Sequence, residues 1–347
     1  MLGAEWVAQH SFRTLQQVNL NAIDFGAAFQ PQFQDRSLAA STTPGATAVA
    51  QDLMRAFQGY GAIQQQLSSG WRTFHSIQIS LNRRFAHGVS FGFNDTISLY
   101  DHQSVDVRLQ HNPDGTYSVR DDQKQAEQLL GTYIANRHTF KGNFLWSLPG
   151  LHATDGALKV VGDVVKNWQL SGIWTASTGT AYTNLFAYQN GATSISLTGS
   201  PDYAARIRLI GPPGSGCSSD PTRQFNTAAF AGPLPNSLGL ESGSDYLRGC
   251  FNSALDLSIV RNIRLGEKRN FQFRLDMFNA PNASAVTGRN STVNLASPTD
   301  PTNATNLPYN PDGTPVPSRL LPKTAGFGVA TTYQAARTLQ AQVRFSF

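Results

Sequence analysis

The stretch Arg337–Phe347, RTLQAQVRFSF, decides the fold class of this chain. Its apolar residues alternate strictly with polar ones, and they are Leu339, Ala341, Val343, Phe345 and Phe347. Such alternation is typical of a β-strand with one apolar and one wet face. An exposed Phe at a sheet edge invites aggregation in water, whereas an aromatic suits the girdle of a barrel in lipid. The stretch therefore predicts a strand of a transmembrane barrel, with the last core strand of a soluble β-sandwich as the alternative.

We interpret Val343, Phe345 and Phe347 as a terminal signal for the barrel-assembly machinery, which would then be a partner of the chain. Outer-membrane lipid would be the second partner, because the apolar side chains of such a strand face the bilayer.

Composition supports a barrel with a polar interior. Charged residues make up 14% of the 347 residues, against about 25% in soluble domains. Aromatic residues make up 10%, and 21 of them are Phe. The sequence contains no run of 18 apolar residues, so we expect no membrane-spanning helix. The formal charge of +5 is mild and scattered along the chain, which argues against nucleic-acid binding.

Seven further segments alternate in the same way, and they cover 2–10, 71–85, 89–99, 138–149, 166–177, 255–265 and 271–278. Most of them have the length of 9–12 residues that a tilted strand needs to cross a bilayer. With the last stretch they predict an all-β, antiparallel barrel segment of about eight spanning strands, which is an incomplete barrel.

The connections between these segments differ in length. Long insertions lie near 101–137, 178–253 and 280–325, while 86–88 and 266–269 are tight turns and 149–165 is of moderate length. Outer-membrane barrels have tight periplasmic turns and long extracellular loops. The alternation of lengths therefore predicts that the long insertions are extracellular loops. A short helix is expected over 48–57.

Charged residues of the predicted strands fall opposite the apolar residues, and they are Asp256, Arg264, Arg274 and Asp276. In a barrel this face lines a hydrated lumen, where a charge need not be fully desolvated. We therefore predict that the four side chains face the lumen.

The two cysteines, Cys217 and Cys250, lie in the same long insertion. An even pair in an exported loop predicts a disulfide, which would stabilise the fold by about 3–4 kcal/mol in the chain-entropy account. Two free buried thiols are the alternative.

The sequence contains no motif of a known catalytic or phosphate-binding site. We therefore expect no enzyme activity, no catalytic residue, no cofactor and no metal site. The two Asn-Pro-Asp-Gly sequences, at 112–115 and 310–313, predict β-turns rather than Ca²⁺ loops. Loop aromatics either touch a ligand or pack loop on loop, and they are Tyr182, Phe186, Tyr188, Phe225, Phe230 and Tyr246.

The order of the motifs resembles one family. In chain order they include SIQISLNRRFAHGVSFGFND, NWQLSGIWTASTGTAYT, YLRGCFNSALDLSIVRNIRL, FQFRLDMFNAPN and FGVATTYQAARTLQAQVRFSF. This order is similar to the distal part of a TonB-dependent transporter, most of all the Oar-like group. The resemblance covers nearly the whole chain.

The resemblance implies a barrel of about 22 strands that is plugged by an N-terminal globular domain. Residues 1–347 would be its C-terminal portion, in the outer membrane of a Gram-negative bacterium. The rest of the barrel, the plug and the TonB box are expected upstream, so TonB would be a partner only through that missing part. The chain would then be a truncated product, a fragment or one piece of a split gene.

The function that follows is uptake of a bulky solute, with this chain supplying lumen wall and substrate-facing loops. Two alternatives remain at this point. One is a complete small barrel of eight strands with an adhesion or structural role, and the other is a secreted soluble β protein that binds carbohydrate.

Overall fold

The fold is built on one large antiparallel sheet. The structure is a computed structural model that describes residues 1–132, 134–149, 166–189, 194–237, 239–240, 242–264, 266 and 269–347. Eight strands follow one another in chain order across the sheet. They are β1 (Leu2–Asn19), β2 (Gln64–Ala86), β3 (Val89–Gln103), β6 (His138–Ser147), β7 (Trp168–Ser177), β13 (Asn252–Arg264), β14 (Asn270–Phe278) and β19 (Thr338–Ser346). The eight strands predicted from alternation are confirmed.

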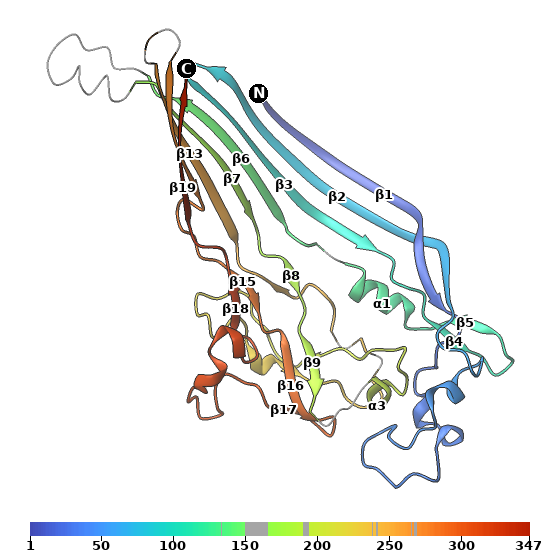
Figure 1. The fold of residues 1–347 in the computed structure, drawn as a ribbon. Coiled ribbons are helices and arrows are strands. Elements are labelled where there is room, and N and C mark those ends of the chain that lie inside the picture. Colours follow the sequence, from blue (N-terminus) through green and yellow to red (C-terminus); the bar gives the residue numbers. More distant parts are fainter. Residues whose placement is uncertain are drawn as a thin grey trace.

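All long connections between these strands lie at one end of the sheet (Figure 1). They cover 20–63, 104–137, 178–251 and 279–337, and we call their described residues the loop region. Both termini and the turn between β2 and β3 lie at the opposite end. That turn is the pair His87 and Gly88, whose φ angles of 53° and 79° are both positive, as a two-residue hairpin turn requires. The connection at 150–165 and most of 265–268 lie outside the described residues.

One face of the sheet is mainly apolar. The register places Phe271, Phe345 and Ile263 side by side on this face, and Leu170, Ile259 and Leu275 form a second such row. Trp146 and Leu81 belong to it farther along the sheet. The other face carries mainly Ser, Thr, Asn, Gln and charged side chains. Period-two alternation in eight paired strands therefore builds a two-sided wall.

No second layer packs on the apolar face within the described residues. Its exposed fractions reach 68% at Trp6, 70% at Phe12 and 62% at Val343. Neither hydrophobic core of the described residues contains a side chain of this face. A soluble sandwich would bury such a face against a second sheet about 10 Å away. The sheet instead has the surface of a wall that meets lipid.

The two outermost strands of the sheet are β1 and β19. Among the described strands, β1 pairs only with β2, and β19 pairs only with β14. The sheet is curved and open, and the described residues form no closed barrel (Figure 1).

The first two strands are longer than predicted. β1 has 18 residues and β2 has 23, about twice the length that a bilayer needs. The register shifts where Thr14 meets Gly70, and pairing resumes beyond this irregularity up to Asn19 and Gln64. Alternation is weak over 11–19, so periodicity alone could not detect this extension.

The loop region has its own secondary structure and its own core. Its strands are β4 (Leu109–His111), β5 (Tyr117–Val119), β8 (Ala181–Tyr182), β9 (Leu185–Tyr188), β10 (Arg208–Leu209), β11 (Phe230–Ala231), β12 (Leu247–Arg248), β15 (Val286–Arg289), β16 (Thr292–Ser297), β17 (Asp300–Ala304) and β18 (Ala330–Tyr333). The main core packs Phe225, Phe230, Leu247, Leu295 and Phe327 together. A smaller core forms around Ile23, Ala27, Ala28 and Met54.

Helices are few in the described chain, and they lie in the loop region. They are α1 (Gln123–Leu130) and α3 (Ser194–Thr198), with short 3-10 turns at Ala27–Phe29, Pro31–Phe33, Gln51–Met54, Thr227–Ala229, Pro317–Arg319 and Pro322–Thr324. The helix expected over 48–57 is wrong in extent, because only Gln51–Met54 forms a single 3-10 turn. Within the described residues, no helix combines the length and the hydropathy that crossing a membrane demands.

Candidate functional site

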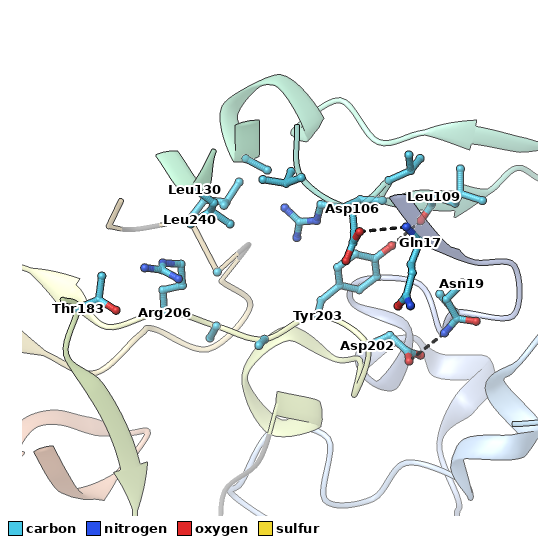
Figure 2. A pocket seen from close by; sticks show the side chains of 18 of the residues that line it. Gln17, Asn19, Asp106, Leu109, Leu130, Thr183, Asp202, Tyr203, Arg206 and Leu240 are labelled. Atoms are coloured by element: carbon cyan, nitrogen blue, oxygen red, sulfur yellow. Dashed lines mark hydrogen bonds between the residues drawn. The ribbon is translucent and has the colours of Figure 1, made fainter. Parts of the chain in front are cut away.

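A cavity lies where the loop region meets the ends of β1 and β2. Its volume is about 740 Å³, within the range of small-molecule sites. Figure 2 shows Gln17 and Asn19 at the end of β1, with Tyr203 and Arg206 from the segment after α3. Residues 105–109 and 183–186 belong to the lining as well, and further lining residues include Ala22, Gln64, Ala126, Leu130 and Leu240. The long β1–β2 ribbon therefore positions one wall, and three different loops supply the rest.

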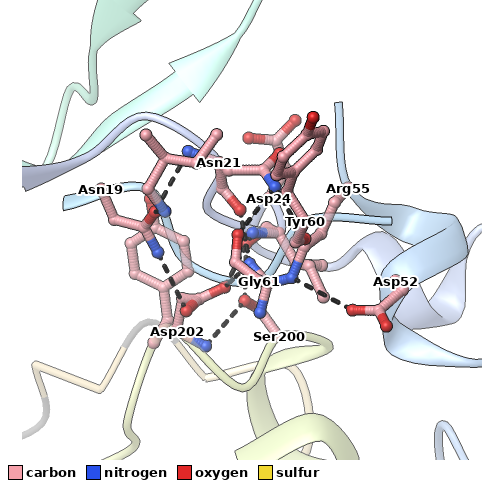
Figure 3. Close-up of polar contacts among 12 residues, drawn as sticks. Asn19, Asn21, Asp24, Asp52, Arg55, Tyr60, Gly61, Ser200 and Asp202 are labelled. Carbon is pink, nitrogen blue, oxygen red and sulfur yellow. Dashed lines mark hydrogen bonds and ion pairs between the residues drawn. The ribbon is translucent and has the colours of Figure 1, made fainter. Parts of the chain in front are cut away.

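Asp202 fastens the loop after α3 to the end of β1. Its carboxylate accepts hydrogen bonds from Asn19 Nδ2 at 3.2 Å and from the backbone N–H of Ile23 at 2.8 Å. It also pairs with Arg55 Nη1 at 3.1 Å, and the Arg55 side chain is 9% exposed. Figure 3 shows this network, with Ser200 donating to the carbonyl of Ile23. The charge of Asp202 is thus matched before any ligand arrives.

Asn21, in the same network, is a fully satisfied buried amide. It is 0% exposed, and its Nδ2 donates to the carbonyls of Phe57, Tyr60 and Gly61 at 2.8–3.0 Å. Its Oδ1 accepts the backbone N–H of Phe57 at 2.8 Å. These bonds hold the turn before β2 against the end of β1, so Asn21 has a structural role.

Tyr203 lies close to two guanidinium groups. The Cζ atoms of Arg108 and Arg120 each lie 5.1 Å from its ring centroid, and both Arg side chains pair with Asp122 at 3.1 and 3.2 Å. Burial raises the pKa of Tyr203 to about 12, although both arginines oppose this shift. Burial likewise lowers the pKa of Arg108, against the pull of Asp122. The ring of Tyr203 is therefore already engaged by two cations, and we assign it to the wall of the cavity.

Asn184 is a buried polar residue of the lining whose side-chain amide has no partner among the described residues. It is 3% exposed, yet neither Nδ2 nor Oδ1 has a hydrogen-bond partner within the described part of the chain. Arg206 nearby is engaged, because its Nε and Nη2 donate to the carbonyls of Ser242 and Gly243 at 2.8 and 3.0 Å. A buried amide without partners costs free energy, and this one lines the cavity.

The cavity is balanced in charge. Its lining contains the cations Arg108 and Arg206 and the anions Asp106 and Asp202. In the ranges that the structure describes, no group of three or more His, Cys, Asp or Glu side chains is placed to hold a metal ion. The arrangement can bind a ligand through hydrogen bonds and apolar contacts.

Sequence reasoning did not select the residues of this cavity. Asn184, Tyr203 and Arg206 come from segments without periodicity, and Asn19 ends a strand that was expected to stop at 10.

The two cysteines are bonded in the structure. The Cα atoms of Cys217 and Cys250 are 5.0 Å apart, and the bond joins residues separated by 33 positions. The disulfide lies in the loop region, and neither cysteine lines the cavity.

The proposed assembly signal lies on the apolar face of β19. Val343, Phe345 and Phe347 have exposed fractions of 62%, 52% and 92%. The rings of Phe345 and Phe347 lie 6.0 Å apart. Their role in assembly stays a prediction.

The register places all four predicted lumen charges on the polar face of the sheet. Arg274 Nε lies 2.9 Å from Asp276 Oδ2. Asp256 accepts the backbone N–H of Asn279 at 2.8 Å, and Arg264 ends β13. None of the four lines the cavity, and their position in a lumen stays a prediction.

The loop aromatics mainly pack on one another. Tyr188, Phe225 and Phe230 belong to the core of the loop region, with Tyr182, Phe186 and Tyr246 packed against it. Phe186 also lines the cavity. Packing of loop on loop, the second interpretation of these residues, describes all six.

The two Asn-Pro-Asp-Gly sequences form matching β-turns. Gly115 N–H donates to Asn112 O at 3.0 Å, and Gly313 N–H donates to Asn310 O at 2.9 Å. In each, the Asp side chain accepts the N–H and hydroxyl of the following Thr. These hydrogen bonds lower the pKa of Asp114 and of Asp312, and the turn prediction is confirmed.

Comparison with known proteins agrees with this architecture. Residues 1–340 match the family described as outer membrane beta barrel domain. Neither the curated proteins nor the solved structures gave a match to the chain. The match covers nearly all of the sequence, and the bare apolar face of the sheet is what a lipid-facing wall requires. The chain therefore belongs to the outer membrane beta barrel domain family and is a barrel protein of the outer membrane.

Proposed function

We propose that this chain is the C-terminal part of the barrel of a TonB-dependent transporter in a Gram-negative bacterium. In this role the polar face of the sheet lines the lumen, and the loop region meets a bulky solute from outside. The order of sequence motifs from SIQISL to the last strand motivates the assignment to this family.

The observation that carries the proposal is the open sheet. Within the described residues, β1 and β19 each have one unpaired edge, and an unpaired edge in lipid leaves backbone groups without partners at several kcal/mol each. Further strands between these two edges would complete a wide barrel. A wide barrel also has room for the four long connections at one end of the wall, whereas eight strands enclose only a narrow interior.

The position of the cavity also fits the uptake of a solute. The loop region is a folded unit with its own core, and it holds a cavity next to the end of the wall. A site of this kind would bind a solute before it enters the lumen. Energy coupling would come from the plug and the TonB box of the complete protein.

The reading frame upstream of Met1 tests the proposal. We expect it to encode further alternating strands, a plug domain and a TonB box. A stop codon followed directly by a signal sequence would support the small eight-stranded barrel instead. A second test uses the complete protein refolded in detergent, which should migrate differently on a gel before and after heating. Migration that is unchanged by heat would count against a barrel.

A further inference from the structure

We infer that the cavity binds a short, extended, uncharged peptide, through the outer edge of β9 at Phe186 and the side-chain amide of Asn184. This names a substrate class for the uptake proposed above and rests on that function. Binding itself can be measured separately from uptake.

The edge of β9 is the first part of the site. β9 pairs in parallel with β16, β16 pairs with β17, and β9 ends this three-stranded sheet. Leu185 N–H donates to Ser291 O at 2.8 Å, and Gln189 N–H donates to Leu295 O at 2.9 Å. These odd-numbered residues direct their main-chain groups toward β16.

The even-numbered residues of β9 direct their main-chain groups to the opposite edge, because successive residues of a strand alternate. Asn184 N–H follows this rule and bonds to Tyr246 Oη at 2.9 Å. Phe186 is the next residue on that edge, and residues 183–186 all line the cavity. An extended peptide in the cavity can therefore add to β9 as a further strand, a common mode of peptide recognition.

Asn184 is the second part of the site. An amide side chain offers two donor hydrogens and an acceptor oxygen, and in Asn184 these lack a partner among the described residues. Asn21 shows how the same fold satisfies a buried amide when its role is structural, with four partners. A peptide group presents one carbonyl and one N–H side by side, which is the complement of a side-chain amide.

The charges of the lining favour an uncharged ligand. Arg108 pairs with Asp122, and Asp202 pairs with Arg55. An anionic ligand would have to compete with these pairs. Leu185, which is 60% exposed and lines the cavity, supplies an apolar contact for peptide side chains beside the edge.

The test uses the complete protein in detergent and a pool of capped hexapeptides randomised over uncharged residues. We expect saturable binding of the pool by calorimetry. A second pool, N-methylated at alternate residues, cannot form the strand ladder, and we expect it to bind at least about tenfold more weakly, the value of one or two hydrogen bonds. No saturable binding, or equal binding of the two pools, would overturn the inference.

Variants test the amide. Asn184→Leu should weaken binding of the pool by about tenfold and should leave the thermal transition unchanged or raised, because it removes an unpaired buried group. Asn303→Leu makes the same change at an exposed residue of β17 outside the cavity, and it should bind like the parent. Weakened binding in both variants, or in neither, would contradict the assignment of Asn184. The N-methylated pool keeps the test decisive if Asn184→Leu fails to fold.

Uptake of a linear glucose hexasaccharide distinguishes a failure of this inference from a failure of the proposed function. Peptide binding without TonB-dependent uptake of either compound would overturn the transport role and leave the peptide site in place. TonB-dependent uptake of the saccharide, with no peptide binding, would overturn the peptide site and leave the transport role.

Discussion

The sheet and the loop region treat apolar side chains in opposite ways. On the sheet, Val343 and Trp6 are 62% and 68% exposed, whereas Phe327 and Leu247 in the loop region are 0% exposed. The loop region buries its apolar residues as any protein does in water. The difference shows that one chain is built for two solvents, with the wall in lipid and the loops in water.

The strongest way to break this contrast is to open the core of the loop region. Phe327→Ala removes a fully buried ring that contacts Phe225 and Phe230 at centroid distances of 4.9 and 5.7 Å. We expect a loss of about 3–5 kcal/mol in the stability of the loop region. Calorimetry of the complete protein should show its transition at lower temperature. Phe345→Ala, on the wall, should leave that transition in place, and an equal shift would contradict two separate environments.

The disulfide should contribute slightly less to the stability of the loop region than the Phe327 ring does. Replacing both Cys217 and Cys250 by Ser frees a ring of 34 residues, one more than their separation of 33, and we expect a loss of about 3–4 kcal/mol in the loop region. Far-ultraviolet circular dichroism of the wall should be unchanged. In the parent protein both cysteines should resist alkylation until the disulfide is reduced. Labelling without reductant would show that the bond is not formed.

A charge on the wall tests which face meets lipid. Ile259→Arg introduces a cation on the apolar face of β13, beside Leu170 and Leu275, and we expect a loss of about 2–4 kcal/mol if this depth is the midplane. Ser258→Arg places the same charge one residue away on the polar face, opposite Asp276. That variant should be nearly neutral in denaturant titrations in lipid vesicles. Equal losses in the two variants would contradict the assignment of the faces.

The smallest effect concerns alkaline pH. Burial raises the pKa of Tyr182, Tyr188 and Tyr203 to about 12. Because the folded-state pKa of these tyrosines is raised, they contribute stability to the loop region below their ordinary pKa of about 10. That contribution is lost as the pH rises toward 12. We expect the loop region to lose stability in this window while the stability of the wall is unchanged. Tyr203→Phe should lessen the alkaline loss, as phenolate absorbance and calorimetry can show, and an unchanged alkaline profile would contradict it.

The wall was predictable because its physics is local. Each strand carries its own alternation, so the period of two revealed the eight strands and their two faces, from the segment 2–10 to the segment 337–347. The extension of β1 to Asn19 was missed, because residues 11–19 pair through an irregular register at Thr14 and Gly70.

The cavity was not predictable, because its walls come from distant segments. Asn19 meets Asp202 across 183 positions, and Tyr203 meets Leu109 across 94. No spacing rule connects such residues without the fold. The unpaired amide of Asn184 could be recognised only after burial and partners were known. The matching turns at 112–115 and 310–313 were predictable, since their hydrogen bonds close within five residues.

The bond between Cys217 and Cys250 also bears on survival outside the cell, where secreted proteases attack exposed loops. A single cut anywhere between the two cysteines leaves both halves of the chain joined through sulfur. β13, β14 and β19 would then remain tethered to the strands before the cut. A nicked molecule could keep its wall intact, so cleavage in this ring need not mean inactivation.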